Sequence, residues 1–297
     1  MKQLLIMFAL MLLSLTACEV KDTVDVPVPP SKLVINCISY GYHPWEAHIS
    51  ASTGILSPGQ FPLVTNATIN IYEDNLFKET LTVDSYNSPD SYNGVRYLGT
   101  TTPKPGKNYK VTVEDQGYEK IESEFRQPDS VKIESVKFQV LGPNTTYTNM
   151  TDIQFRVGFN DPPGVDFYEI TAIGFVDTTY FNNTQQLKFS FVDPAYAENN
   201  DLFYQTLAFD DSYFDGKLVE LDFISQIFTR ADDEQFKYYT VYLRHLSKEY
   251  YLYMKSTNLQ LKAANDAFAQ PVLIESNITN GYGIFGGFTQ TKVTIGR

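Results

Sequence analysis

A succession of short runs rich in β-branched and aromatic residues places the tightest limit on how this chain can fold. Ala67–Tyr72 and Tyr109–Val113 alternate apolar and polar residues, which is typical of a strand with one buried face. About seven such runs in about a hundred residues predict an immunoglobulin-like β-sandwich over residues 32–128. Turn residues separate the runs, which are Lys32–Ser39, Glu46–Ser52, Thr68–Glu73, Lys78–Val83, Arg96–Gly99, Asn108–Asp115 and Tyr118–Arg126.

A second series of runs follows Gln127-Pro128-Asp129 and predicts a second β-sandwich-like domain over residues 129–297. The segment Glu198–Gly216 is expected to be irregular. The predicted strands are Val131–Leu141, Thr151–Asn160, Phe167–Phe175, Gln186–Val192, Lys217–Phe223 and Tyr238–Leu246.

Near the C-terminus the apolar period changes from that of a strand to that of a helix. Ser247 is a predicted N-cap, and the helix is expected over about Lys248–Lys262. Its apolar face is predicted from the spacing of Tyr250, Met254, Thr257 and Leu261. A glycine-rich turn should then lead into a final strand, Gly283–Ile295. The fold class is therefore mainly β with one C-terminal helix.

The N-terminus is predicted to carry a secretory signal over residues 1–17, because Lys2 precedes an apolar run that is too short to span a bilayer. Leu15-Thr16-Ala17-Cys18 matches the bacterial lipobox, in which the cysteine receives the acyl chains, palmitate among them. The alternative is a chance cysteine after an ordinary signal peptide. Residues 18–31 are polar and proline-rich, and a chain of this kind would form an extended tether of roughly 40 Å.

Composition and motifs exclude several classes of function. The net charge is −12 and basic runs are missing, so nucleic acid is not an expected partner. After Cys18 only Cys37 remains, and it is expected to be a buried structural thiol. The sequence has no nucleophile elbow, phosphate-binding loop, dinucleotide fingerprint or zinc motif. We therefore expect a protein that is not an enzyme and needs no cofactor.

Two groups of residues are candidates for binding. Asp210, Asp211 and Asp215 lie in an aspartate-rich loop that could supply oxygen ligands to calcium, although the spacing is not that of an EF-hand and a solvated loop is the alternative. The aromatic loop Tyr40–Trp45 could instead contact a ligand or partner through Tyr42, His43 and Trp45. Its alternative is packing at the edge of the sandwich core.

The C-terminal residues also carry a family resemblance. Leu246–Tyr253, Pro271-Val272 and Ser276–Gly286, with Asn160–Gly164 and the lipobox, resemble the Bacteroidetes lipoproteins grouped as domain-of-unknown-function family 4249. The resemblance implies an outer-membrane lipoprotein of the kind often encoded beside TonB-dependent receptors. The acidic residues after Cys18 loosely resemble signals that send such proteins to the cell surface. No catalytic residues are implied.

These observations predict a lipid-anchored protein of the outer membrane, displayed at the cell surface. Its expected role is accessory: it binds a ligand or partners a TonB-dependent nutrient transporter without catalysing a reaction. The alternative is a surface adhesin or envelope scaffold, because tandem β domains on a lipid anchor suit that role equally well.

Overall fold

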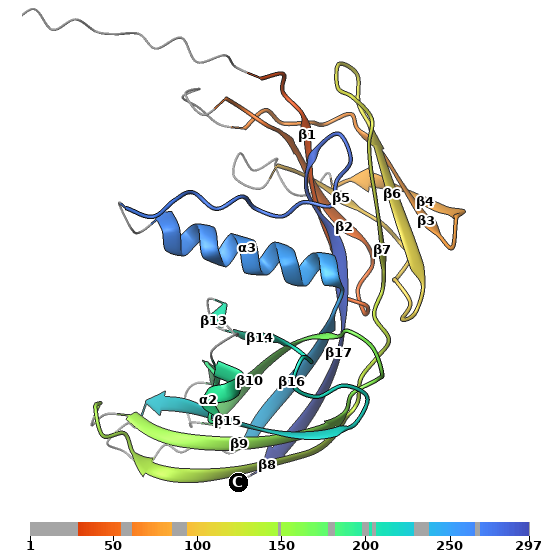
Figure 1. The fold of residues 1–297 in the computed structure, drawn as a ribbon. Helices are drawn as coiled ribbons and strands as arrows, with labels where there is room; N and C mark the ends of the chain where they lie inside the picture. Colours follow the sequence, from red (N-terminus) through yellow and green to blue (C-terminus); the bar gives the residue numbers. More distant parts are fainter. Residues whose placement is uncertain are drawn as a thin grey trace, which may run out of the picture. The chain divides into compact units, whose positions relative to one another are not determined.

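The part of the chain that the structure describes is mainly β, as the alternating runs predict (Figure 1). The structure is a computed structural model, and it describes residues 29–54, 61–84, 94–147, 150–177, 182–197, 202–203, 206–228, 238–264 and 268–296. The predicted signal and the predicted lipidation site Cys18 lie outside the described residues. Every element below belongs to the unit Ser31–Arg297. Within the described ranges, no helix combines the length and apolarity that crossing a bilayer requires.

The described residues of the N-terminal part form seven strands, and all seven correspond to predicted runs. They are β1 (Leu33–Ser39), β2 (Glu46–Ala51), β3 (Thr68–Glu73), β4 (Leu76–Val83), β5 (Val95–Leu98), β6 (Asn108–Glu114) and β7 (Ile121–Arg126). Their hydrogen-bonded order is β1-β2-β5-β4-β3-β6-β7. Residues of β1 alternate between buried and half-buried along its whole length, so one face of the strand lines a core.

The last strand, β17 (Tyr282–Gly296), completes this part of the fold. It pairs in parallel with β1, in a register that sets Ile35 against Gly283. The segment just before β17 also reaches the opposite edge strand, because the Thr279 N–H donates to the Glu122 carbonyl of β7 at 2.9 Å. Asn277 holds the segment on β17 itself, where its side chain both donates to and accepts from the Phe285 backbone. The glycine- and asparagine-rich stretch therefore closes the strand path from β7 back to β17.

The second part of the chain has two facing layers. One is the four-stranded sheet β12-β15-β9-β8, and the other is β13-β14-β10-β16-β17, with β11 paired to β10. Aromatic contacts cross between the layers, such as Phe155 to Tyr239, whose ring centroids lie 5.3 Å apart. The elements are β8 (Ile133–Pro143), β9 (Met150–Asn160), β10 (Phe167–Asp177), β11 (Asn182–Leu187), β12 (Ser190–Phe191), α2 (Pro194–Ala197), β13 (Leu202–Phe203), β14 (Thr206–Asp210), β15 (Leu218–Phe228) and β16 (Tyr238–Leu246).

Two sequence-based expectations for this part need correction. The single predicted strand Gln186–Val192 is divided between the end of β11 and the short β12, which belong to different sheets. The segment Glu198–Gly216 is not wholly irregular, because it contains β13 and β14. The burial of Leu207 and Phe209 against β10 explains why β14 forms a strand despite its polar surroundings.

Helix α3 (Lys248–Ala264) begins as predicted. The Ser247 hydroxyl accepts a hydrogen bond from the Tyr250 N–H at 3.3 Å, which is the N-cap geometry. Leu246 and Tyr251, which have the spacing of a hydrophobic staple around the N-cap, lie in one buried cluster with Phe288 of β17. The helix therefore packs on β17.

The predicted apolar face of α3 is only partly correct. Tyr250 and Met254 are half-buried in that cluster, but Leu261 is 45% exposed. The helix instead buries Ser256 and Asn258. The cause is the returning segment after Pro271, which lies along the helix: Ser256 accepts a hydrogen bond from the Glu275 N–H. Ser256 is tolerated at this buried position because a backbone donor of the neighbouring segment binds its hydroxyl, whereas the buried Asn258 Nδ2 atom has no hydrogen-bond partner among the described residues.

Two large hydrophobic clusters form the core. The first combines residues of β1–β7 with Ile278 and Phe285, so the C-terminal segment supplies part of it. The second fills the space between the two layers formed by β8–β17. Residues of β17 contribute to both clusters. The domain boundary between residues 128 and 129 remains a prediction. Cys37 is a buried free thiol within the first cluster, as expected, and burial raises its pKa.

Candidate functional site

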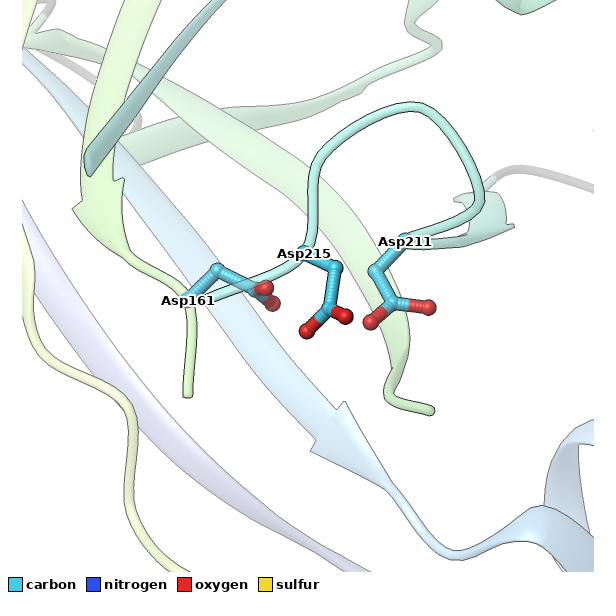
Figure 2. A group of neighbouring side chains, drawn as sticks. All are labelled: Asp161, Asp211 and Asp215. Carbon is cyan, nitrogen blue, oxygen red and sulfur yellow. The ribbon is translucent and has the colours of Figure 1, made fainter. Parts of the chain in front are cut away.

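Three aspartates lie close together where two loops meet at one end of the two facing layers in the second part of the chain. The pairing of the flanking strands brings the two loops together. Asn160 at the end of β9 pairs with Leu218 at the start of β15. Phe167 at the start of β10 pairs with Asp210 at the end of β14. The loop 161–166 and the loop 211–217 must therefore lie side by side. Each of Asp161, Asp211 and Asp215 places a carboxylate oxygen within 4.8 Å of the other two, and we call this group the acidic centre (Figure 2).

Local hydrogen bonds fix two of the three carboxylates. Asp161 accepts from the Tyr168 hydroxyl at 2.5 Å and from the Gly216 N–H at 2.8 Å. Asp215 accepts from the Gly164 N–H at 2.9 Å, so each loop binds an aspartate of the other. Gly164 and Gly216 both have positive φ, a conformation that glycine adopts without steric cost. The two loops are therefore held together by reciprocal carboxylate contacts.

Asp211 differs from its neighbours because one of its oxygens has no partner. The residue is 4% exposed, and its Oδ2 atom is buried without a hydrogen-bond donor. An unsatisfied buried polar group costs about 1–3 kcal/mol, and more when it is charged. Burial, followed by the charges of Asp161 and Asp166, raises the pKa of Asp211 to about 6. Burial also raises the pKa of Asp161, against the hydrogen bonds from Tyr168 and Gly216.

The loop 161–166 is also anchored to β16 through His245. The imidazole Nε2 lies 2.6 Å from the Asp166 carboxylate, and Nδ1 lies 2.8 Å from the Asp129 carbonyl oxygen. A carbonyl oxygen only accepts, so Nδ1 carries a hydrogen. The Asp166 carbonyl in turn accepts from the Asp211 N–H. His245 therefore links Asp129, which lies in the sequence between the residues of the two large hydrophobic clusters, to the loop that carries Asp161.

The structure brings together only two of the three aspartates that the sequence nominates for calcium. Asp211 and Asp215 belong to the acidic centre, but the Asp210 carboxylate accepts from the Ser212 N–H and stays outside it. The third member is Asp161, about fifty residues earlier. Its signal in the sequence was the loop Asp161-Pro162-Pro163-Gly164 at the end of a predicted strand, which gives no indication of the partner loop.

The aromatic loop between β1 and β2 divides into exposed and buried residues. Tyr42 is 50% exposed and His43 is exposed, and their rings lie 4.7 Å apart. Gly41 has φ +70° and lies close to the Phe288 carbonyl, so the loop rests on β17. Beside it is a hollow of about 330 Å³, lined by Tyr40, His43, Pro44, Trp45, Glu46, Leu98 and Gly99. Tyr42 and His43 are therefore accessible to a ligand or partner.

Trp45, the third aromatic candidate, is a core residue. Its side chain is 1% exposed, and its ring packs 5.0 Å from Tyr109 and 5.7 Å from Phe285. The alternative of packing at the sandwich core is therefore correct for this residue. The alternation of β2 explains it, because Trp45 shares the inward phase of Ala47 and Ile49.

Comparisons with known proteins place the chain in a family without a described activity. No curated protein matches it. A solved structure titled "Biofilm associated protein - B domain" matches at 8% identity, covering 88% of this chain and 85% of that one, with a TM-score of 0.19, which is too low to indicate a shared fold. The model of the family described as "Domain of unknown function (DUF4249)" matches residues 20–294. Since that match spans nearly the whole sequence, this chain belongs to the DUF4249 family.

Proposed function

We propose that this protein is a non-catalytic, lipid-anchored accessory protein of the outer membrane that binds a ligand or partner for a TonB-dependent nutrient transporter. The observation that carries the proposal is the exposed aromatic pair Tyr42 and His43 beside the hollow at the β1–β2 loop. The lipobox ending at Cys18 adds to it, because a lipid anchor would keep such a surface close to a membrane receptor.

The chemistry of the loop suits recognition of a partner. Exposed tyrosine and histidine rings combine apolar faces with polar tips, and tyrosine is among the residues that concentrate binding energy at interfaces. The hollow has a volume at the lower end of the range for small-ligand pockets. Trp45, at the end of the loop, packs against Tyr109 in the core, which holds this end of the loop in place and limits the part of the surface that must be ordered on binding.

Co-purification tests the proposal directly. The full-length protein is extracted from outer membranes with detergent, isolated by a C-terminal tag, and its companions are identified by mass spectrometry. We expect a TonB-dependent receptor to accompany the native chain and its yield to fall at least about tenfold when Tyr42 and His43 are both replaced by alanine. Tyr147→Ala is the matched control, because Tyr147 is 54% exposed and lies on the β8–β9 connection.

Three results would contradict the proposal. If the native protein purifies without a companion, the proposed association with a transporter is contradicted. Binding only to cells, matrix or other envelope proteins favours the adhesin or scaffold alternative. Turnover in a broad hydrolase screen would show that the protein is an enzyme.

A further inference from the structure

We propose that the acidic centre binds one calcium ion, held by Asp161, Asp211 and Asp215. The proposal is independent of the lipid anchor and of the transporter. It rests on two separate observations: three carboxylate oxygens converge within 4.8 Å, and Asp211, which is 96% buried, presents an oxygen with no donor. Figure 2 shows the three carboxylates next to one another, with Asp211 and Asp215 on one loop and Asp161 beside Asp215.

The spacing of the oxygens fits the ion. Calcium binds oxygen at about 2.3–2.6 Å, so two ligands on opposite sides of the ion are about 5 Å apart and neighbouring ligands are closer. Three oxygens within 4.8 Å of one another can therefore surround a single calcium ion with little movement. Because Asp215 is exposed, water can reach the centre and supply the remaining ligands.

The donor set favours calcium over other common metals. All three ligands are carboxylates, whereas zinc sites are usually built from histidine and cysteine. Magnesium needs a near-ideal octahedron at about 2.0–2.1 Å and keeps several of its waters. Calcium tolerates irregular geometry, which suits carboxylates whose positions are already set by the Tyr168 hydroxyl and by the N–H groups of Gly164 and Gly216.

A bound ion would change how the two loops are held. Without it, three carboxylates repel one another, and the loops are held by backbone N–H groups. Gly164 and Gly216 donate to the aspartate side chains, and the Asp211 N–H donates to the Asp166 carbonyl. With it, the ion bridges the ends of β9 and β14 and gives the buried Asp211 carboxylate a partner of opposite charge. Loop 161–166, already fastened to β16 through Asp166 and His245, would then be fixed at both ends.

Calcium titration of the full-length protein tests the proposal. After treatment with a chelator, isothermal titration with Ca²⁺ should show one site with a Kd of about 10⁻⁴–10⁻³ M, the range of extracellular calcium modules. About 5 mM Ca²⁺ should raise the melting temperature by several degrees. The same concentration of Mg²⁺ should have a much smaller effect.

Single substitutions locate the site. Asp211→Asn and Asp215→Asn should each weaken calcium binding at least about tenfold, because each removes a charged ligand. Asp210→Asn is the matched control and should bind like the native protein, since the Asp210 carboxylate lies outside the centre. Asp215→Asn changes an exposed residue, so it remains informative if Asp211→Asn disturbs folding.

The possible results of these titrations distinguish a defined calcium site from its alternatives. A native protein with neither calcium heat nor a calcium-dependent melting shift overturns the proposal. Equal loss of binding in Asp210→Asn and Asp215→Asn would show diffuse charge attraction without a defined site. Asp211→Asn that melts higher than the native protein and responds much less to calcium is the expected result, because the change neutralises a buried charge and removes a charged ligand.

Discussion

Replacement of Gly283 by alanine should be among the most damaging small substitutions in this chain. Gly283 has φ +110°, and a Cβ added there would lie 1.9 Å from the Ile35 carbonyl oxygen on β1. Real Cβ atoms stay at least about 3 Å from such an oxygen, so the backbones of β1 and β17 would have to separate by ~1 Å. Neither atom can move aside, because both strands are held in the sheet.

The magnitude follows from two contributions. Placing a non-glycine residue at this φ costs about 1–3 kcal/mol. Separating the parallel pair by ~1 Å breaks two or three of its backbone hydrogen bonds, at about 1 kcal/mol each. We expect the free energy of unfolding to fall by about 3–6 kcal/mol, a large share of the stability of an ordinary domain.

Gly117→Ala is the matched control. Gly117 also has positive φ, +93°, but an added Cβ would meet nothing within 4 Å. Alanine there should cost only the conformational strain, about 1–2 kcal/mol. The difference between the two variants isolates the contact between β1 and β17.

Urea unfolding followed by tryptophan fluorescence suits the measurement. Trp45 is the only tryptophan in the sequence, and its ring packs 5.7 Å from Phe285, two residues after Gly283. Its emission should shift to the red at a much lower urea concentration in Gly283→Ala than in Gly117→Ala. Equal midpoints for the two variants would refute the argument that the parallel pair requires glycine.

Three further predictions follow from buried contacts, acid titration and the anchor. Tyr251→Ala should lower the free energy of unfolding by about 3 kcal/mol, because Tyr251 is 3% exposed and its ring stacks 4.5 Å from that of Phe167. Leu261→Ala, at a 45% exposed position of the same helix, should lower it by less than about 1 kcal/mol. Thermal melts of both variants measure the difference. Burial raises the pKa of Glu79, but hydrogen bonds from two neighbouring threonines outweigh it and lower that pKa below its usual 4.5. A lowered folded pKa stabilises the protein above the unfolded value, so this contribution should be lost as the pH falls below about 4.5. Urea midpoints between pH 7 and pH 3 should then decline less in Glu79→Gln, and identical declines would contradict the assignment. Cys18→Ala should abolish acylation, so a palmitate analogue that still labels this variant would disprove the lipobox interpretation.

Local sequence determined much of the secondary structure. The runs of β1, β3 and β16 were recognisable because alternation reflects one buried face and needs no knowledge of the partner strand. Ser247 was recognisable as the N-cap of α3 because capping involves residues only three positions apart. The exposed positions of Tyr42 and His43 agree with their place in a turn between two strands.

Long-range contacts decided the rest. The acidic centre needs Asp161 and Asp211, fifty residues apart, and only the pairing of β9 with β15 and of β10 with β14 brings them together. The burial of polar Ser256 on α3 depends on a returning segment that periodicity does not contain.

The role of the C-terminal strand shows the same limit. Its β-rich sequence predicts that it pairs, but not with what. Only the tertiary structure shows that β17 lies between β16 and β1, and that Phe285 enters the cluster of the first strands. The physical reason is that a strand's own residues specify which face is buried, whereas its neighbours depend on surfaces contributed by distant parts of the chain.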